Sequence, residues 1–411
     1  MATINDLSFS SWRNLLGLDP WYDNGGNQAV TGTAGDDQIT VNNGNDTVYA
    51  GTGHDRIFDK GSGSDAIYGQ GGDDAIIAGN GASNYYDGGT GTDAVDFWQL
   101  GAGVGVDVNL GLDRADAFNA AGGYVAGFTL KSIENVYGGQ GGDTIIGNDV
   151  ANRIYGNEGN DLLDGGFGND YLFGGVGNDT AYGGVGNDTL LGGTGADYLA
   201  GSVGNDRIEG DFGGDTVLGE AGDDVLIGGW DSDAIYGGAG SDSLFGDVTG
   251  VTGLAASLFA GNDYLNGGDG IDYIYGGAGN DTLVGGLGKD SLIGEAGADV
   301  FRFASTQDST IIPGFTQLGL ESGYDRIFGF EHGIDRIDVS AIDADTTVAG
   351  NQAFTQTFGT TFTDEGQFRV AYDAATSTTS AYFNTDRNFS TAEMVIQLAG
   401  NVLVTSSDLY L

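Results

Sequence analysis

A period of nine residues dominates this sequence and limits the folds that it can adopt. From residue 161 to residue 242 an aspartate stands at every ninth position, within the unit Gly-Gly-x-Gly-x-Asp-x-apolar-x. A short period of this kind indicates a solenoid, in which each repeat packs mainly on its neighbours. The aspartates of this series are Asp161, Asp170, Asp179, Asp188, Asp197, Asp206, Asp215, Asp224, Asp233 and Asp242.

The same frame continues on both sides of this series, with interruptions. An insertion at 248–259 precedes further repeats, and Asn152 takes the aspartate position of one upstream unit. An earlier and rougher block has one extra residue before Asp65 and a degenerate unit at Ser83. The remaining repeat aspartates are Asp37, Asp46, Asp55, Asp65, Asp74 and Asp93 in the earlier block, and Asp143, Asp263, Asp272, Asp281, Asp290 and Asp299 around the main series.

Each repeat divides into a glycine-rich turn and a short strand whose central side chain is apolar, as at Leu163, Leu172 and Leu190. Glycine suits such turns because it adopts positive φ without penalty. A strand of three residues buries little apolar surface alone, so we expect two repeats to form one coil and coils to stack about 4.8 Å apart. The sequence therefore predicts an all-β chain built around a right-handed parallel β-roll with 18 residues per coil.

The charge of the chain indicates that its partners are cations. With 59 acidic against 13 basic residues, the formal charge of -46 opposes compaction unless positive ions lie among the carboxylates. The same charge argues against nucleic acid and anionic lipid as partners, since both are bound through Lys and Arg. No apolar run approaches the length of a membrane span, and we expect no cleaved export signal at residues 1–6.

Calcium is the cation that these residues fit best. It accepts about six to eight oxygen ligands in irregular geometry, which one carboxylate and several turn carbonyls can supply. Zinc and copper favour His or Cys ligands, whereas this chain has 2 His and no Cys. Magnesium requires a tighter octahedron.

The units GGFGNDYLF and GGVGNDTLL resemble the RTX, or haemolysin-type, calcium-binding repeat, and units of this kind fill well over half of the chain. The resemblance implies that calcium lies between the turns of successive coils, held by aspartate side chains and turn carbonyls. Ligands two repeats apart would share an ion, so that Asp161 acts with the turn of Asp179, and Asp170 with that of Asp188. It therefore makes all the repeat aspartates named above candidate ligands of multiple Ca²⁺ ions.

Three segments depart from the repeats. Residues 1–31 include Trp12 and Trp21 and are expected to form either a cap over the first coil or an anchoring or self-association element. Residues 98–137 resemble the spacer strands between RTX blocks, and 303–411 resembles the C-terminal domain of serralysin-type proteases, expected to be β-sandwich-like. The predicted division of the chain is 1–31, a first repeat block at 32–97, the spacer at 98–137, the main roll at 138–302 and a C-terminal β-domain at 303–411.

The last residues, Ser407-Asp408-Leu409-Tyr410-Leu411, place apolar side chains after an acidic one. This ending is similar to the uncleaved signal that type I secretion machinery reads, although a final β-strand is the alternative. Together with the repeats it predicts a protein that is secreted to the extracellular space or the cell surface. Low cytosolic calcium would keep the chain unfolded for passage, and external calcium would fold it afterwards.

No catalytic site is recognisable in the sequence. The two histidines, His54 and His332, cannot build the His-Glu-x-x-His zinc site of serralysin-type proteases, and the Gly-x-Ser-x-Gly elbow of lipases is absent. We therefore expect no enzyme activity. The leading hypothesis is a structural, self-assembling surface or matrix protein. A monomeric calcium-dependent adhesin or polysaccharide-binding module is the first alternative, and an unrecognised carbohydrate-active enzyme is the second, because 59 acidic residues could include a pair of catalytic carboxylates.

Overall fold

The chain folds as two units of β-strands, Met1–Val203 and Gly204–Leu411, which are described separately here. The predicted insertion at 248–259 and residues 1–25 of the predicted cap or anchor lie outside the described residues. No helix among the described residues is long and apolar enough to cross a membrane. The computed structural model describes residues 26–247, 261–305, 307–308, 324–342, 355–356, 367–385 and 394–410.

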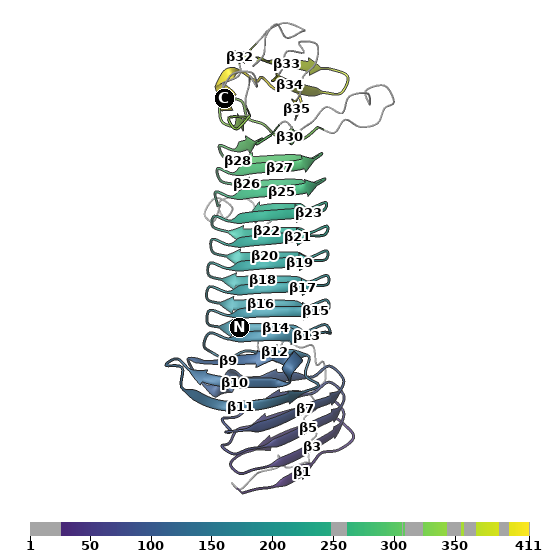
Figure 1. Ribbon diagram of the computed structural model, residues 1–411, viewed down its shortest axis with the longest axis vertical. Helices are drawn as coiled ribbons and strands as arrows, with labels where there is room; N and C mark the ends of the chain where they lie inside the picture. The colour runs from purple at the N-terminus through teal and green to yellow at the C-terminus, as the bar shows by residue number, and fades with distance from the viewer. Residues whose placement is uncertain are drawn as a thin grey trace. The chain divides into compact units, whose positions relative to one another are not determined.

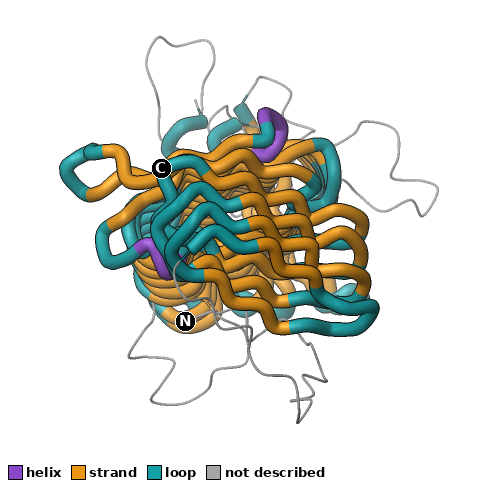
Figure 2. Tube along the Cα trace, turned by 90° about the horizontal axis from the view of Figure 1, so that it is seen from below, coloured by secondary structure: helices purple, strands orange, loops and turns teal. Residues whose placement is uncertain are grey.

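The first unit contains two ladders of strands, joined by turns at the two edges of the roll (Figures 1 and 2). Most neighbours within a ladder are parallel and come from successive coils. The first ladder contains, in spatial order, β1 (Ala29–Thr31), β3 (Thr47–Thr52), β5 (Ala66–Gly71), β7 (Asn84–Thr90), β11 (Tyr124–Lys131), β10 (Arg114–Asn119), β9 (Val104–Asn109), β13 (Thr144–Asn148), β15 (Leu162–Phe167), β17 (Thr180–Val185) and β19 (Tyr198–Val203). The second contains β2 (Gln38–Val41), β4 (Arg56–Asp59), β6 (Ala75–Ile77), β8 (Ala94–Asp96), β12 (Asn135–Tyr137), β14 (Arg153–Glu158), β16 (Tyr171–Val176) and β18 (Thr189–Thr194).

The core of the roll is a column of single apolar side chains from successive coils. Ile154 lies opposite Leu172, and Leu172 lies opposite Leu190, each pair 18 residues apart in the sequence. All three side chains are fully buried, because in a strand alternate residues face the same side. The predicted all-β fold and parallel β-roll with 18 residues per coil are thereby confirmed.

The spacer strands of the first unit are built into its ladders. Strands β9, β10 and β11 form an antiparallel meander that occupies the first ladder between β7 and β13. In the second ladder β12 alone joins β8 to β14. Both blocks of repeats in this unit therefore share the same two ladders. Two short 3-10 helices, Trp98–Leu100 and Leu110–Leu112, flank β9.

The second unit repeats the same construction. Its register survives the insertion, because Ile235 of β23 lies opposite Leu265 of β25 although 30 residues separate them. One ladder contains β21 (Thr216–Ala221), β23 (Ala234–Ala239), β25 (Tyr264–Gly270), β27 (Thr282–Gly288), β29 (Val300–Arg302) and β31 (Arg336–Asp338). The other contains β20 (Arg207–Phe212), β22 (Val225–Trp230), β24 (Ser243–Asp247), β26 (Tyr273–Ala278), β28 (Ser291–Ala296) and β30 (Arg326–Phe328).

The C-terminal strands add to these two ladders. Strand β35 (Met394–Ala399) pairs with β30, and β36 (Leu409–Tyr410), which follows the 3-10 helix η5 (Ser406–Asp408), pairs with β31. The antiparallel pairs of β34 with β33 and with β35 complete the described part, together with the short β32. The sandwich-like domain and the domain boundaries stay predictions. The remaining bounds are β32 (Thr355–Gln356), β33 (Gln367–Asp373) and β34 (Thr378–Asn384).

The alternation of buried and exposed positions predicts opposite outcomes for two neighbouring leucines of β15. Leu163 is fully buried and Leu162 is 42% exposed. Leu163→Ala should lower the free energy of unfolding by about 2–5 kcal/mol because it leaves a cavity among the apolar core side chains. Leu162→Ala should change it by less than about 0.5 kcal/mol. Urea unfolding in saturating calcium measures both, and equal losses would contradict this register.

Candidate metal centres

The repeat aspartates form columns in which each turn is hydrogen-bonded to the turn of the next coil. The N–H of Asp161 donates to Asp179 Oδ1 (2.8 Å), and the N–H of Asp179 donates to Asp197 Oδ1 (2.7 Å). The N–H of Asp170 donates in the same way to Asp188 Oδ1 (2.7 Å). The structure therefore brings together the turns of Asp161 and Asp179, and those of Asp170 and Asp188, as the repeat resemblance implies.

The second carboxylate oxygen, Oδ2, differs from the first in its surroundings. In many repeat aspartates it is buried and accepts no hydrogen bond. A buried charged oxygen without a partner costs considerable free energy, so it requires a cation or a proton. The aspartates with this open Oδ2 include Asp55, Asp65, Asp74, Asp93, Asp161, Asp170, Asp179, Asp224, Asp233, Asp242, Asp263, Asp272, Asp281, Asp290 and Asp299.

A main-chain carbonyl of the next coil converges on the open oxygen. A Cβ built on Gly156 would collide with Asp161 Oδ2 and lie 2.6 Å from the carbonyl oxygen of Gly174. Gly174 is the first residue of the turn that contains Asp179. Glycine therefore leaves a small space lined by hard oxygen atoms of two coils, and this donor set fits calcium.

Carboxylates alone do not complete such a site. Across the described ranges, no three Asp, Glu or His side chains gather in a way that could hold a metal ion. A cation between two turns would therefore take most of its ligands from main-chain carbonyls, as one carboxylate per turn allows.

The backbone of the residue four before the aspartate distinguishes most open turns from the others. In most open turns this residue has a positive φ, as Gly166 (94°) does before Asp170. Several turns adopt the same conformation without glycine, although it costs an L-residue about 1–2 kcal/mol. These residues are Gln70 (78°), Asn157 (77°), Ser202 (80°), Asp211 (73°), Glu220 (75°) and Glu295 (75°).

Two predicted ligands lie in closed turns, in which a main-chain N–H donates to Oδ2 of the aspartate. The N–H of Thr33 donates to Asp37 Oδ2 (2.5 Å), and the N–H of Gly139 donates to Asp143 Oδ2 (2.6 Å). Neither donor residue has a positive φ, so its N–H turns toward the carboxylate. Asp65 departs from both patterns, because Gly61 donates its N–H to Asp59 Oδ1 (3.4 Å) and not to Asp65. Burial and the adjacent carboxyl group of Asp59 raise the pKa of Asp65 to about 7.

Three residues extend the columns beyond the sequence prediction. Asn84, rather than Ser83, holds the column position, since its Oδ1 accepts the N–H of Asp65 (3.0 Å). Asp325 Oδ1 accepts the N–H of Asp290 (3.0 Å), and Asp335 Oδ1 accepts that of Asp299 (3.1 Å). The order Asp-x-apolar recurs at Asp325 and Asp335 and could have revealed them, but the glycine-rich turn is missing there.

A second row of hydrogen bonds between coils, called the outer ladder, is formed by the side chain of the residue that precedes the repeat aspartate. Asn160 Oδ1 accepts the N–H of Asn178 (2.9 Å), and Asn178 Oδ1 accepts that of Ala196 (2.9 Å). These side chains are exposed and neutral, so the ladder links neighbouring coils without a cation.

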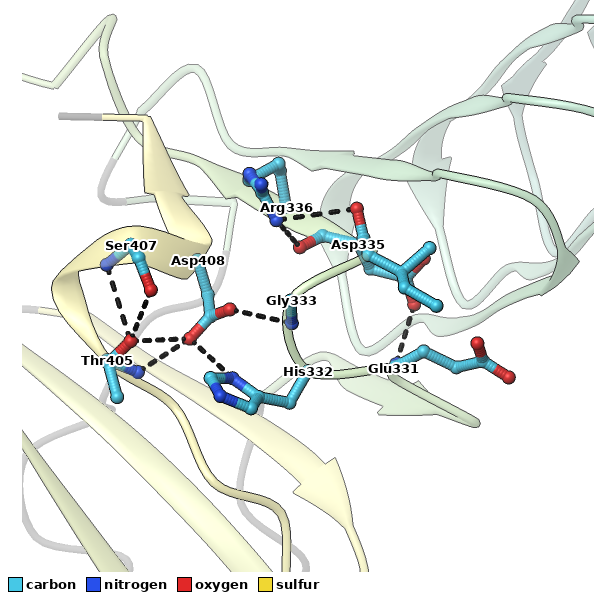
Figure 3. Close-up of polar contacts among 9 residues, drawn as sticks. Glu331, His332, Gly333, Asp335, Arg336, Thr405, Ser407 and Asp408 are labelled. Carbon is cyan, nitrogen blue, oxygen red and sulfur yellow. Dashed lines mark hydrogen bonds and ion pairs between the residues drawn. The ribbon is translucent and has the colours of Figure 1, made fainter.

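The C-terminal aspartate is satisfied by hydrogen bonds (Figure 3). Asp408 is fully buried; its Oδ1 accepts the N–H of Gly333 (3.0 Å), and its Oδ2 contacts His332 Nδ1 (2.9 Å) and accepts the N–H of Thr405 (2.8 Å). Burial raises the pKa of Asp408, but these hydrogen bonds outweigh it and hold the pKa below the usual range. The structure thus forms the final strand, β36, that was one of the two alternatives for this end of the chain.

Burial raises the pKa of many column aspartates above the usual range of a carboxyl group. It brings the pKa of Asp179 to about 7, that of Asp281 to about 8 and that of Asp233 to about 9. The hydrogen bond from the preceding coil lowers each value, and neighbouring carboxylates raise it. At neutral pH the metal-free carboxyl groups of Asp281 and Asp233 therefore favour protons, which a cation would have to displace.

Comparison with protein families supports the assignment of the repeats. A family model described as the RTX calcium-binding nonapeptide repeat matches more than half of the chain. No curated protein matches the chain. The family match covers residues 22–57, 61–85, 137–172, 146–181, 173–208, 182–217, 209–244, 259–292 and 279–308.

Solved structures include similar chains. The solution structures of the AlgE6R3 and AlgE6R2 subunits from the *Azotobacter vinelandii* mannuronan C5-epimerase are 25% and 21% identical and both have a TM-score of 0.27. The matches cover 48% and 47% of this chain, and 80% and 90% of those chains. The crystal structure of the extracellular lipase LipA from *Serratia marcescens* is 13% identical with a TM-score of 0.20, and the match covers 91% of this chain and 42% of that one.

The raised pKa values predict how stability depends on pH when calcium is absent. Aspartate in an unfolded chain has a pKa of about 3.9, whereas the pKa values of Asp170 and Asp179 in the roll are about 6 and about 7. The folded chain then binds more protons, so its free energy of unfolding should fall as pH rises from about 5 to about 8. Saturating calcium requires ionised carboxylates and should reverse the trend. Thermal unfolding followed by circular dichroism on calcium-stripped protein measures this, and a Tm that stays constant over the window would contradict it.

Proposed function

The chain belongs to the RTX calcium-binding nonapeptide repeat family, and from this premise we propose that it is secreted, folds on calcium outside the cell and serves as a structural, self-assembling surface or matrix protein. Its repeats bind calcium, and their number implies multiple Ca²⁺ ions. The observation that carries the proposal is the column of buried carboxylates whose Oδ2 is open.

The open turns supply the ligands for calcium within the roll. Asp161 Oδ2 and the carbonyl of Gly174 face one space from two successive coils, so an ion there would join the coils. Calcium neutralises the carboxylates and satisfies their orphaned oxygens. We propose the repeat aspartates with an open Oδ2 as ligands; Asp37 and Asp143 differ from them, because their second oxygen already accepts a main-chain N–H.

The free energy of calcium binding is large enough to decide whether the roll folds. Sites of extracellular modules have Kd values of about 0.1–1 mM, so a tenfold excess of calcium stabilises each by about 1.4 kcal/mol. About ten sites then contribute about 14 kcal/mol, which is comparable with the net stability of a typical domain. Folding would follow the calcium concentration around the chain.

This dependence supports export through type I secretion machinery. In low calcium at neutral pH the carboxylates of the open turns are not neutralised, and the coils that contain them stay unfolded. Leu409 and Tyr410 would then be free of β31, with which they pair in the folded chain. External calcium would fold the roll and place this end in its ladder.

A row of exposed apolar side chains on the first unit supports the assembly role. Phe167, Val185 and Val203 are 57%, 45% and 54% exposed, and they lie opposite one another in β15, β17 and β19. Such a row favours contact with another surface, and calcium would reduce the repulsion between chains that each carry a charge of -46.

A monomeric adhesin or polysaccharide-binding module is the second candidate. The rings of Tyr182 and Tyr198 lie 6.0 Å apart on the outer face of the first unit, and both side chains are partly exposed. Exposed aromatic rings of this kind can stack on sugars. An unrecognised carbohydrate-active enzyme is the third candidate, and turnover of a polysaccharide abolished by replacing one carboxylate outside the repeats would establish it.

Replacing one open carboxylate should remove calcium binding locally. Asp224 Oδ1 accepts the N–H of Asp206 (2.8 Å), which Asn would retain, while Oδ2 is open. We expect Asp224→Asn to lower the number of bound ions by about one and the Tm in calcium by about 3–6 °C. Native mass spectrometry and circular dichroism measure the two effects.

The neighbouring residue provides the control for that substitution. Asp223 is exposed, and its Oδ1 accepts the N–H of Ser241 (2.8 Å) in the outer ladder. Asp223→Asn removes the same charge but keeps this bond, so the number of ions should not change. Equal loss of calcium from both variants would show that net charge, rather than the open oxygen, determines binding.

Sedimentation velocity across a calcium titration tests the proposed function as a whole. In chelator we expect an expanded monomer, because the carboxylates are not neutralised. Calcium should compact it and then produce large regular species. Compaction that ends at a monomer would overturn the assembly role and favour the adhesin, and a compact protein in chelator would overturn folding on calcium.

A further inference from the structure

We propose that residues 94–152 of the first unit, called the central segment below, fold without calcium and form the core on which the calcium-dependent coils assemble. The segment runs from β8 through the meander β9–β11 to Asn152. Within it the chain's own hydrogen bonds take the place of cations. The inference does not depend on self-assembly or secretion.

Two column positions of the central segment, Asp143 and Asn152, are closed, and the third, Glu134, accepts the N–H of Asp93 at Oε2 (2.8 Å). Asp143 accepts the N–H of Val106 at Oδ1 (2.7 Å) and that of Gly139 at Oδ2 (2.6 Å), so neither oxygen is orphaned. Asp143 Oδ2 lies beside the carbonyl of Gly156 as Asp161 Oδ2 lies beside that of Gly174, but at Asp143 a main-chain N–H already donates to the oxygen. The calcium site implied by the repeat is replaced here by a second main-chain donor.

Asn152 closes its own turn with a neutral side chain that both donates and accepts hydrogen bonds. Its Nδ2 donates to the carbonyl oxygen of Glu134 (2.7 Å), and its Oδ1 accepts the N–H of Asn148 (2.9 Å). The side chain is almost fully buried, and Glu134 precedes it by 18 residues. An amide thus links two coils at the level where a cation would link them in an open turn, and it brings no charge that must be neutralised.

A hydrogen-bond network closes one more turn just before the central segment. Tyr86 donates its hydroxyl hydrogen to Asp59 Oδ2 (2.7 Å) and accepts a hydrogen bond from Asn84 Nδ2 (3.1 Å). All three side chains are buried. Asp59 lies beside Gly79 as Asp161 lies beside Gly156 in the main repeats, but the Oδ2 of Asp59 accepts a hydrogen bond. Asp93, whose Oδ2 is open, is the calcium-dependent position that adjoins the segment.

The central segment also has a larger apolar core than the coils around it. Phe128 lies 5.1 Å from Phe97 within the segment and 5.6 Å from Tyr86 of the adjoining strand β7, measured between ring centroids, and these rings are buried. A coil of the main repeats instead contributes one aliphatic side chain per strand, such as Leu172. Because β10 pairs with its sequence neighbours β9 and β11, the meander itself forms from local contacts.

Hydrogen exchange on the full chain, with and without calcium, tests the inference. In EGTA we expect amides of residues 94–148 to exchange at least about tenfold more slowly than those of residues 161–203, because only the latter turns depend on cations. In calcium both segments should be protected. Equal exchange of the two segments in EGTA, whether fast or slow, would overturn the proposal.

A substitution at Asn152 tests whether the hydrogen bonds of this side chain, rather than the packing of the central segment as a whole, protect the segment in the absence of calcium. Asn152→Asp removes the donor to Glu134 and adds a buried charge, so exchange at residues 135–148 in EGTA should accelerate by at least about tenfold. Asn160→Asp adds the same charge at an exposed position whose Oδ1 can still accept the N–H of Asn178. Hydrogen exchange at residues 135–148 of Asn160→Asp should match that of the parent protein. Equal exchange rates in the two variants would refute the role assigned to Asn152.

Discussion

The hydrogen bond from the N–H of each column aspartate to Oδ1 of the aspartate one coil later is the interaction on which the roll depends. It fixes the distance and register between turns, as between Asp161 and Asp179 (2.8 Å). It also holds the carboxylate in the interior, where Oδ2 cannot reach water. The same bond that orders the coils therefore creates a column of charge that only cations or protons can neutralise. Structure and calcium dependence have one physical origin.

The glycine pattern follows from this requirement. The residue four before the aspartate must direct its N–H away from the carboxylate, and positive φ achieves this, as at Gly166. At Gly139, which lacks positive φ, the N–H instead satisfies Oδ2 of Asp143 and the turn closes. That Glu220 and Glu295 adopt positive φ despite their side chains indicates that stacking with neighbouring coils outweighs the local backbone cost.

Much of this architecture is predictable from the period alone. Repeat length sets the 18-residue coil, and the apolar position within the repeat identifies core residues such as Leu172. Periodicity locates aspartates but does not show where a main-chain N–H points, so the closed state of Asp37 and Asp143 was not predictable. Periodicity also fails where the spacing between repeats changes. The pairing of strands, rather than a fixed number of residues per coil, brings three further side chains into the columns: Asn84, Asp325 and Asp335.

The chain thus combines two ways of joining coils that respond differently to calcium. Open turns concentrate buried carboxylates, so their free energy depends on the ions around them. The Asn160–Asn178 ladder and the closed turns at Asp143 and Asn152 join coils through neutral groups or main-chain donors, whose contribution does not require a cation. Register can therefore be specified where calcium is scarce, while the stability of the full roll still depends on it. Calcium would then select a geometry that the hydrogen bonds already encode, rather than determine that geometry itself.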